Sequence, residues 1–242
     1  MTTKKYDFSN DVEMEEILKV KNNIKILKTK VENAANKINK KPEEIKIMAV
    51  TKTVNPILVN VAIKEGIFLL GENKAQEFLE KYDSYLKENV EFHFIGHLQS
   101  KKVKQIIKIV DTIESVDSFN LAQIISKEAK KINKTIPILL EINIGDEESK
   151  FGFKKNELLK NIILISKLEN LKIKGLMSIP PIKNVEQYFK QMQTIYIDIS
   201  NKKIDNVDMN FLSMGMSNDF EKAIFYGANI VRIGSFLFGS RK

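Results

Sequence analysis

The sequence predicts an α/β fold, a single (β/α)₈ barrel of the TIM type with an extra N-terminal helix. Helical and strand-like patterns alternate along the chain. Most strand-like segments are almost continuously apolar, as in parallel sheets that are covered on both faces. Glycines stand just after several of these segments, where the loops at the mouth of a barrel begin. We expect one domain, over residues 1–242.

The N-terminal part of the chain carries an apolar stripe at helical spacing. Its members lie three, four or seven residues apart: Ile17, Val20, Ile24, Leu27, Val31 and Ile38. Such a stripe indicates an amphipathic helix. Because it spans only about three heptads, we expect it to pack on the barrel rather than to form a coiled coil.

Eight apolar segments are predicted as strands: residues 45–50, 67–70, 92–95, 109–116, 136–144, 171–177, 209–213 and 229–233. Eight parallel strands are the number that closes a TIM barrel, and a chain of 242 residues is an ordinary length for that fold. An open doubly wound sheet is the alternative, but no Gly-x-Gly-x-x-Gly follows the first strand.

Helices are predicted between the strands, at residues 55–64, 73–86, 118–132, 155–168 and 185–199. Asn55 is a good N-cap, Pro56 suits the first helical position, and Gly66 ends that helix. Ser217 stands before a further helical turn that Gly227 ends, just ahead of the eighth strand.

Five glycines follow predicted strands two, three, five, seven and eight: Gly71, Gly96, Gly145, Gly215 and Gly234. In a barrel these positions are the βα loops, the face on which functional sites form. Small residues there allow a ligand to approach the backbone. The glycines therefore indicate a binding site at this mouth.

Lys52 lies two residues after the end of the first predicted strand and so at the same mouth. The 39 lysines and arginines include two arginines, which leaves 37 lysines, most of them scattered over polar stretches. A lysine held by a rigid strand end can form an imine with a carbonyl compound. The alternative is a lysine whose amine simply reaches from the strand end into water.

Two of the mouth loops suit a phosphate group. Ser213-Met214-Gly215-Met216-Ser217 follows strand seven and offers hydroxyls and backbone N–H groups ahead of a helix. Gly234 and Ser235 do the same after strand eight. Phosphate sites in TIM barrels recur after strands seven and eight. A plain helix cap explains Ser217 equally well.

The two arginines, Arg232 and Arg241, stand out in a chain that uses lysine almost everywhere. An imine-forming Lys52, a phosphate cup and Arg232 at the end of strand eight together fit pyridoxal 5′-phosphate (PLP). Arg232 would face the pyridine nitrogen and, since it cannot accept the ring proton, would leave that nitrogen largely unprotonated.

Other residues near the strand ends have two interpretations each. Asn73 either caps a helix or turns its amide to a ligand, and Met177, at the end of strand six, either lines the pocket or fills the core. The only two histidines, His93 and His97, have no third ligand pattern beside them, so we expect no metal site. His93 is predicted as a core histidine with its polar atoms satisfied.

Composition excludes several classes of function. The formal charge of +8 comes with dispersed lysines and no aromatic RNA-binding motif, so we expect no nucleic-acid partner. The chain has no cysteine, no apolar run long enough to span a bilayer and no signal-peptide pattern in residues 1–7. We therefore expect a cytoplasmic protein without membrane contact.

The sequence resembles the pyridoxal phosphate homeostasis proteins of the YggS-like type over almost its whole length. The matching stretches occur in order: Ala49–Lys52, Gly71–Glu77, His93–Ser100, Ser149–Gly152, Gly175–Met177, Leu212–Ser217 and Arg232–Arg241. The family's Leu-Gln-Ser-Asn-Lys pattern departs at one position here, where Lys101 replaces asparagine. The resemblance implies the barrel of the alanine racemase N-terminal domain and a cofactor carrier or buffer that supports vitamin B6 and amino-acid balance.

We accordingly predict a PLP carrier without catalytic turnover or catalytic residues. Its predicted cofactor-binding residues are Lys52, Asn73, Met177, Ser213, Gly215, Met216, Ser217, Arg232, Gly234 and Ser235. We expect a monomer that contacts apo PLP enzymes transiently. A PLP-dependent amino-acid racemase of low activity is the second hypothesis, and an imine-forming aldolase-type barrel is the third. Few residues follow strand eight, so we expect no second domain to cover the cofactor.

Overall fold

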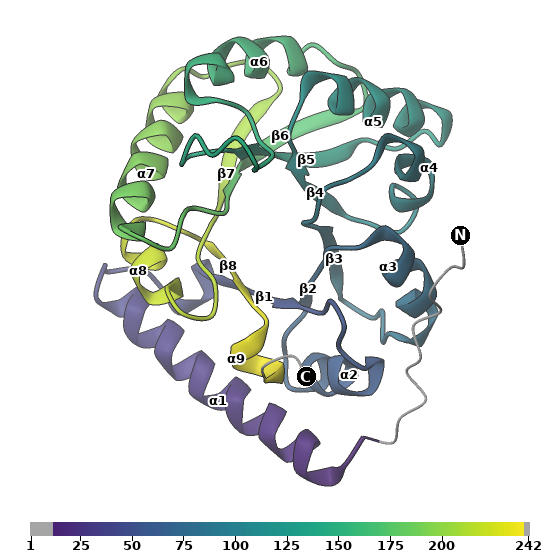
Figure 1. Ribbon diagram of the computed structural model, residues 1–242, viewed down its shortest axis with the longest axis vertical. Helices are drawn as coiled ribbons and strands as arrows, with labels where there is room; N and C mark the ends of the chain where they lie inside the picture. Colours follow the sequence, from purple (N-terminus) through teal and green to yellow (C-terminus); the bar gives the residue numbers. More distant parts are fainter. Residues whose placement is uncertain (1–11, 240–242) are drawn as a thin grey trace.

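The computed structural model describes residues 12–239, in which eight parallel strands close into a barrel (Figure 1). The strands are β1 (Lys46–Val50), β2 (Leu69–Glu72), β3 (Glu91–Phe94), β4 (Thr112–Val116), β5 (Ile136–Ile142), β6 (Leu171–Ser178), β7 (Val207–Ser213) and β8 (Ile230–Ile233). They follow one another around the barrel in chain order, and β8 pairs with β1 to close it. The predicted (β/α)₈ barrel is confirmed, while Arg241 lies outside the described residues.

The helices surround the barrel: α1 (Met14–Asn36), α2 (Pro56–Lys64), α3 (Ala75–Lys81), α4 (Val103–Ile106), α5 (Phe119–Lys131), α6 (Leu158–Ile165), α7 (Val185–Asn201), α8 (Phe220–Phe225) and α9 (Ser235–Phe238). Within residues 12–239 the chain also forms four 3₁₀ turns: η1 (Pro42–Glu44), η2 (Tyr82–Ser84), η3 (Ser100–Lys102) and η4 (Lys155–Glu157).

The extra N-terminal helix α1 completes the outer ring. It packs against α2, α8 and α9 on the side where β8 meets β1 (Figure 1). The helix that follows β8, α9, is only four residues long and covers little of the barrel wall. The apolar stripe of α1, buried at Val20, Ile24, Leu27 and Val31, fills that place, so its predicted packing is confirmed.

Several predicted boundaries were wrong. Strand β4 begins at Thr112 rather than at residue 109, because Ile109 and Val110 close the turn after α4 by hydrogen bonds to Ile106. Gly71 lies within β2 rather than after it. The short helices α4 and α9 were not predicted, since four residues cannot display a helical period. The segment predicted as one helix at 73–86 is α3 followed by η2.

The helix caps were predicted with mixed success. Asn55 caps α2 by accepting a hydrogen bond from the Ile57 N–H at 2.9 Å, as expected. Ser217 caps no helix, because α8 starts at Phe220 and is preceded by Asp219. Asn73 is no cap either, since Lys74 is the residue that precedes α3.

The main core lies between the barrel wall and the helices, and a small second cluster lies inside the barrel. The second cluster consists of Met48, Leu69 and Ile230, from three strands, and Ile95, which directly follows β3.

Candidate functional site

A cavity of about 330 Å³ opens at the carboxyl ends of the strands. Seven of the ten predicted site residues line it: Lys52, Asn73, Met216, Ser217, Arg232, Gly234 and Ser235. They come from the loops after β1, β2 and β7 and from β8 and the loop after it. The structure thus brings together residues up to 183 positions apart, Lys52 and Ser235, in one cavity. That they bind a cofactor stays a prediction at this point.

Three predicted site residues do not line this cavity. Met177 is fully buried in β6, beside Ser213 of β7. Ser213 points into the barrel, where its hydroxyl donates to Glu114 Oε2 at 2.6 Å. Gly215 has φ +93° and packs on Ala223, which a Cβ atom would meet at 2.5 Å, so it is needed for the turn of the loop. That Ser213 and Gly215 form part of a phosphate cup stays a prediction, and the Ser213 hydroxyl already has a partner in Glu114.

Arg232 is 4 % exposed and its guanidinium is held in a fixed place. Nη1 donates to Ser213 Oγ at 2.7 Å, and Nη2 donates to the Ser178 carbonyl oxygen at 2.8 Å. A guanidinium has five N–H donors, so these two bonds leave others for the cavity that Arg232 lines. Burial lowers the pKa of Arg232, and the charges of Glu114, Glu141 and Asp219 oppose that shift.

A polar network continues beneath Arg232. His93 Nδ1 lies 2.6 Å from Glu114 Oε1, and Glu114 also accepts the Ser213 hydrogen bond. Burial by itself would lower the pKa of His93, but hydrogen bonds to Glu114 and Glu91 outweigh it and raise that pKa. The core interpretation of His93 is therefore confirmed, and its partner Glu114 is a residue that sequence reasoning missed.

Ser217 and the loop after β8 meet on one side of the cavity. The Ser217 hydroxyl oxygen accepts from the Phe236 N–H at 3.2 Å, which leaves its own hydrogen to donate elsewhere. The Met216 N–H is already occupied by the Asp219 carboxylate at 2.6 Å. The available donors on this side therefore include the Ser217 hydroxyl, with Gly234 and Ser235 beside it.

Asn73 supplies a second indication of a ligand. Its Oδ1 is buried and has no hydrogen-bond partner among residues 12–239. A buried acceptor without a partner costs free energy, so such atoms usually meet a donor from water or from a ligand. Asn73 lines the cavity that also contains Lys52.

Apolar residues form much of the remaining wall of the cavity. Val50, Ile95 and Ile179 stand at strand ends, and Ile182 is 91 % exposed at the rim. Sequence reasoning did not select them, although the alternation of inward and outward side chains along a strand points to Val50 and Ile95. An apolar slot with a few polar groups is the usual composition of a small-molecule site.

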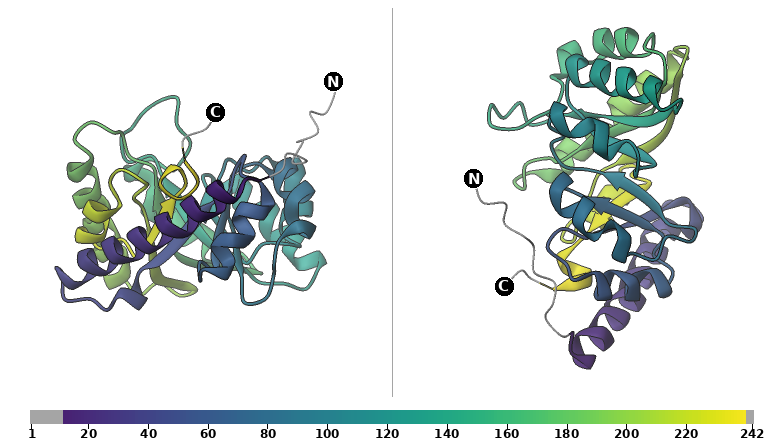
Figure 2. Two further views of the ribbon diagram at one scale, coloured as in Figure 1. Left: turned by 90° about the horizontal axis from the view of Figure 1, so that it is seen from below. Right: turned by 90° about the vertical axis from the view of Figure 1, so that its right-hand side faces the viewer.

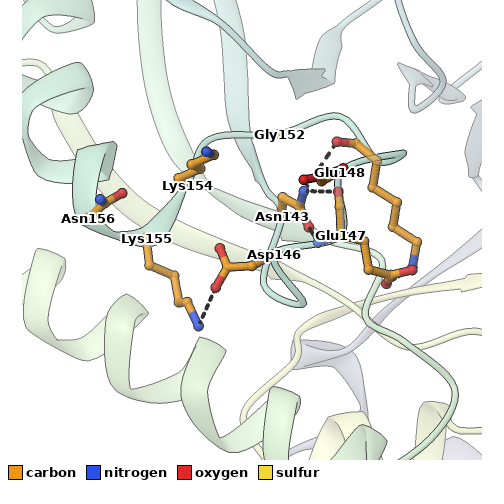
Figure 3. A pocket seen from close by; sticks show the side chains of 9 residues that line it. Asn143, Asp146, Glu147, Glu148, Gly152, Lys154, Lys155 and Asn156 are labelled. Carbon is orange, nitrogen blue, oxygen red and sulfur yellow. Dashed lines mark hydrogen bonds and ion pairs between the residues drawn. The ribbon is translucent and has the colours of Figure 1, made fainter.

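The loop after β5 lines a separate pocket, which Figure 3 shows from close by. Asn143 braces the loop by donating to the Glu147 carbonyl at 2.7 Å, and Asp146 pairs with Lys155 at 3.2 Å. In the right-hand view of Figure 2 this loop (teal) extends from the same side of the barrel as α9 (yellow). Phe151 of this loop stacks on His97 at 3.8 Å, which ties it to the loop after β3.

A smaller cavity of about 250 Å³ lies under that loop and shares Asn73, Ile95 and Ile179 with the first. Glu141 of β5 lines it. Burial raises the pKa of Glu141 to about 7, the charge of Asp117 adds to the shift, and Arg232 opposes it. The sequence contained no signal for this group, because its burial and its charged neighbours Asp117 and Arg232 depend on segments far from it in the chain.

Within residues 12–239, no three metal-ligating side chains come together, and no helix combines the length and apolarity needed to cross a bilayer.

A closed parallel barrel whose mouth gathers a lysine, a buried arginine and serine–glycine loops defines a barrel of the alanine racemase N-terminal type. The family profile described as "Alanine racemase, N-terminal domain" matches residues 20–242. The chain belongs to the pyridoxal phosphate homeostasis protein family, as its motifs indicated. A pyridoxal phosphate homeostasis protein of Aquifex aeolicus is 39 % identical over 217 residues, which cover 88 % of this chain and 94 % of that protein.

Solved structures agree with this assignment. A crystal structure of an unknown protein from Bifidobacterium adolescentis is 28 % identical, with a TM-score of 0.91, and the match covers 97 % of this chain and all of that one. The PipY protein of Synechococcus elongatus, solved with PLP bound, is 27 % identical with a TM-score of 0.74. That match covers 87 % of this chain and 100 % of PipY.

Proposed function

We propose that this chain, as a single barrel domain, binds PLP in the mouth cavity and carries or buffers it through a covalent link to Lys52. The observation that supports this most is the meeting of Lys52, Arg232, Ser217 and Gly234 in one cavity. The cavity volume of about 330 Å³ falls at the lower end of the roughly 300–1,000 Å³ range of ligand pockets. PipY, a relative by sequence and fold, binds PLP.

The groups present fit this cofactor. The Lys52 amine is the group that would bond to its aldehyde, and the Ser217 hydroxyl, with Gly234 and Ser235, would hold its phosphate. The unpartnered Asn73 Oδ1 is available to a donor on the ligand. When bound, PLP supplies an electrophilic aldehyde and a ring that accepts electrons. Arg232, fixed by Ser213 and Ser178, would keep the ring nitrogen unprotonated and so limit that capacity.

We further propose that the protein does not turn over amino acids. The described residues that line the cavity include no tyrosine, cysteine, histidine or second lysine. Asp219 is the one carboxylate among them, and its Oδ1 already accepts from Met216. A racemase needs a group that moves a proton at the far face of the substrate. The carrier is therefore favoured over the racemase, and we propose that it works as a monomer that meets apo PLP enzymes transiently.

Borohydride reduction of protein incubated with PLP, followed by peptide mapping, tests the proposal. We expect the pyridoxyl group on Lys52 and a loss of the visible absorption band in Lys52→Ala. A label on Lys74 or Lys150 with Lys52 unmodified would contradict the assignment, and a colourless protein would favour the aldolase-type hypothesis.

Turnover is tested separately, by following Cα–H exchange, racemisation and transamination of L-amino acids in heavy water. We expect transfer of PLP to an apo-enzyme without Cα chemistry. Saturable turnover by the parent protein that disappears in Lys52→Ala would establish an enzyme instead.

A further inference from the structure

A buried ion pair lies behind the turn that carries Lys52. Glu77 and Lys81 stand one helical turn apart in α3, and Lys81 Nζ is 2.6 Å from Glu77 Oε1. Both side chains are fully buried. Neither lines the mouth cavity, so neither belongs to the site described above.

The pair binds the backbone on both sides of Lys52. Lys81 Nζ donates to the carbonyl oxygen of Thr51 at 2.9 Å. Glu77 Oε1 accepts a hydrogen bond from the Thr53 N–H. The residue before Lys52 and the residue after it are therefore fixed by two charged groups of a single helix.

The turn adopts a backbone conformation that it would not hold by itself. Thr53 has φ +60°, in the left-handed region that β-branched residues strongly avoid. Strained residues persist where the surroundings determine their conformation, and they gather at functional sites. Here the bond from Thr53 to Glu77 supplies part of that constraint.

The ionic character of the pair points to a role beyond stability. A buried ion pair loses its hydration, and apolar residues of similar volume often give equal or greater stability. Glu77 and Lys81 instead hold the turn through hydrogen bonds in two fixed directions. An apolar pair would pack there but would not set the direction of the backbone at Lys52.

We propose that Glu77 and Lys81 are positioning residues, which hold the Lys52 turn so that its amine faces the mouth cavity. The inference rests on the proposed function, because it assigns to Lys52 the link to PLP. Because the turn is already ordered in the free protein, PLP binding does not have to pay the entropy cost of ordering it. The affinity for PLP is therefore higher than it would be with a mobile turn.

Amide hydrogen exchange of the PLP-free parent protein tests whether Glu77 and Lys81 hold the Lys52 turn, and it needs no variant. Thr53 lies in a turn between β1 and α2, yet we expect its N–H to exchange at least about 100-fold more slowly than the amides of exposed turns. Exchange of Thr53 at the rate of an exposed turn would overturn the inference.

The double variant Glu77→Gln with Lys81→Met removes both charges of the pair together. We expect exchange over residues 51–54 to be about 10-fold faster, with β5 and β6 unchanged, and PLP to bind about 10-fold less tightly. The matched control is Asp83→Asn with Lys87→Met, which removes an exposed i,i+4 pair of the neighbouring turn and should alter neither quantity.

The two proposals fail separately. If residues 51–54 exchange at the parent rate in the double variant, or if PLP affinity equals that of the parent, the positioning role is wrong. If the pyridoxyl label in the parent lies elsewhere than on Lys52, the proposed function is wrong, whatever the exchange rates show.

Discussion

Arg232 donates a hydrogen bond from Nη1 to the hydroxyl oxygen of Ser213, across 2.7 Å in the barrel interior. Ser213 in turn donates to Glu114, so one hydroxyl bridges a buried guanidinium and a buried carboxylate. Ser217, four residues further along the chain, lines the cavity at the mouth. The two serines that looked like a pair of phosphate donors therefore have different surroundings and different expected roles.

Ser213→Ala is expected to act on stability. Removing the hydroxyl takes one partner from Arg232 and one from Glu114, which should lower the free energy of unfolding by about 1–3 kcal/mol. Urea unfolding measures this, with Ser200→Ala, an exposed serine of α7, as the control. The affinities for PLP and for pyridoxal should fall by the same factor, because the substitution acts on both ligands through Arg232. A loss of affinity for PLP but not for pyridoxal would indicate that Ser213 binds the phosphate.

Ser217→Ala is expected to act on the phosphate. A hydrogen bond to a charged group contributes about 1.5–3 kcal/mol, so the Kd for PLP should rise roughly 10- to 100-fold. Pyridoxal, which lacks the phosphate, should bind almost as it does to the parent. Titration of both ligands checks this by absorbance. An equal loss of affinity for the two ligands would mean that the phosphate lies elsewhere in the cavity.

Glu141→Gln should change how stability depends on pH. Burial raises the folded-state pKa of Glu141 from its ordinary 4.5 to about 7. Between these values the unfolded chain releases the proton while the folded protein keeps it, so this group's stabilisation is complete below pH 4.5 and is lost as pH rises through 7. The loss amounts to at most about 3 kcal/mol.

Unfolding of parent and variant at pH 5 and pH 8 isolates that contribution. We expect the variant to gain stability relative to the parent at the higher pH. The nearby charges of Asp117 and Arg232 are the same in both proteins. If the difference in unfolding free energy between parent and variant does not change with pH, the pKa of Glu141 is not raised in the folded protein.

Leu27→Ala should destabilise the barrel through α1. Leu27 is fully buried where this helix packs on the barrel, and truncation of a buried leucine costs about 2–5 kcal/mol. Leu18→Ala on the exposed face of the same helix, where the side chain is 59 % exposed, should cost less than about 0.5 kcal/mol. Similar losses for the two variants would mean that α1 contributes little to the fold.

Much of the architecture was predictable because it depends on local patterns. The apolar stripe of α1 and the cap at Asn55 are properties of neighbouring residues, and the structure confirms both. Lys52 and the loops around Ser217 and Gly234 were found in the same way, since each follows a strand and strand ends of a parallel barrel share one face.

The details of the site required the closed barrel. Whether a residue at a strand end faces the interior or the cavity depends on register, and register shifts interrupt the β5–β6 and β6–β7 pairings. Ser213 reaches Glu114 across 99 positions of sequence, and that contact decides its role. Burial in the closed barrel raises the pKa of Glu141, Asp117 after β4 adds to the shift, and Arg232 of β8 opposes it.

The sequence by itself determined the eight strands, the lysine at the end of the first and the family to which the chain belongs. These features follow from hydrophobic period, glycine position and short motifs, which neighbouring residues specify. Only the tertiary structure decided which serine faces the cavity, which acid sits beneath Arg232 and how Glu77 and Lys81 hold the Lys52 turn. Burial and hydrogen bonding between distant segments arise only when the barrel closes, and no local pattern encodes them.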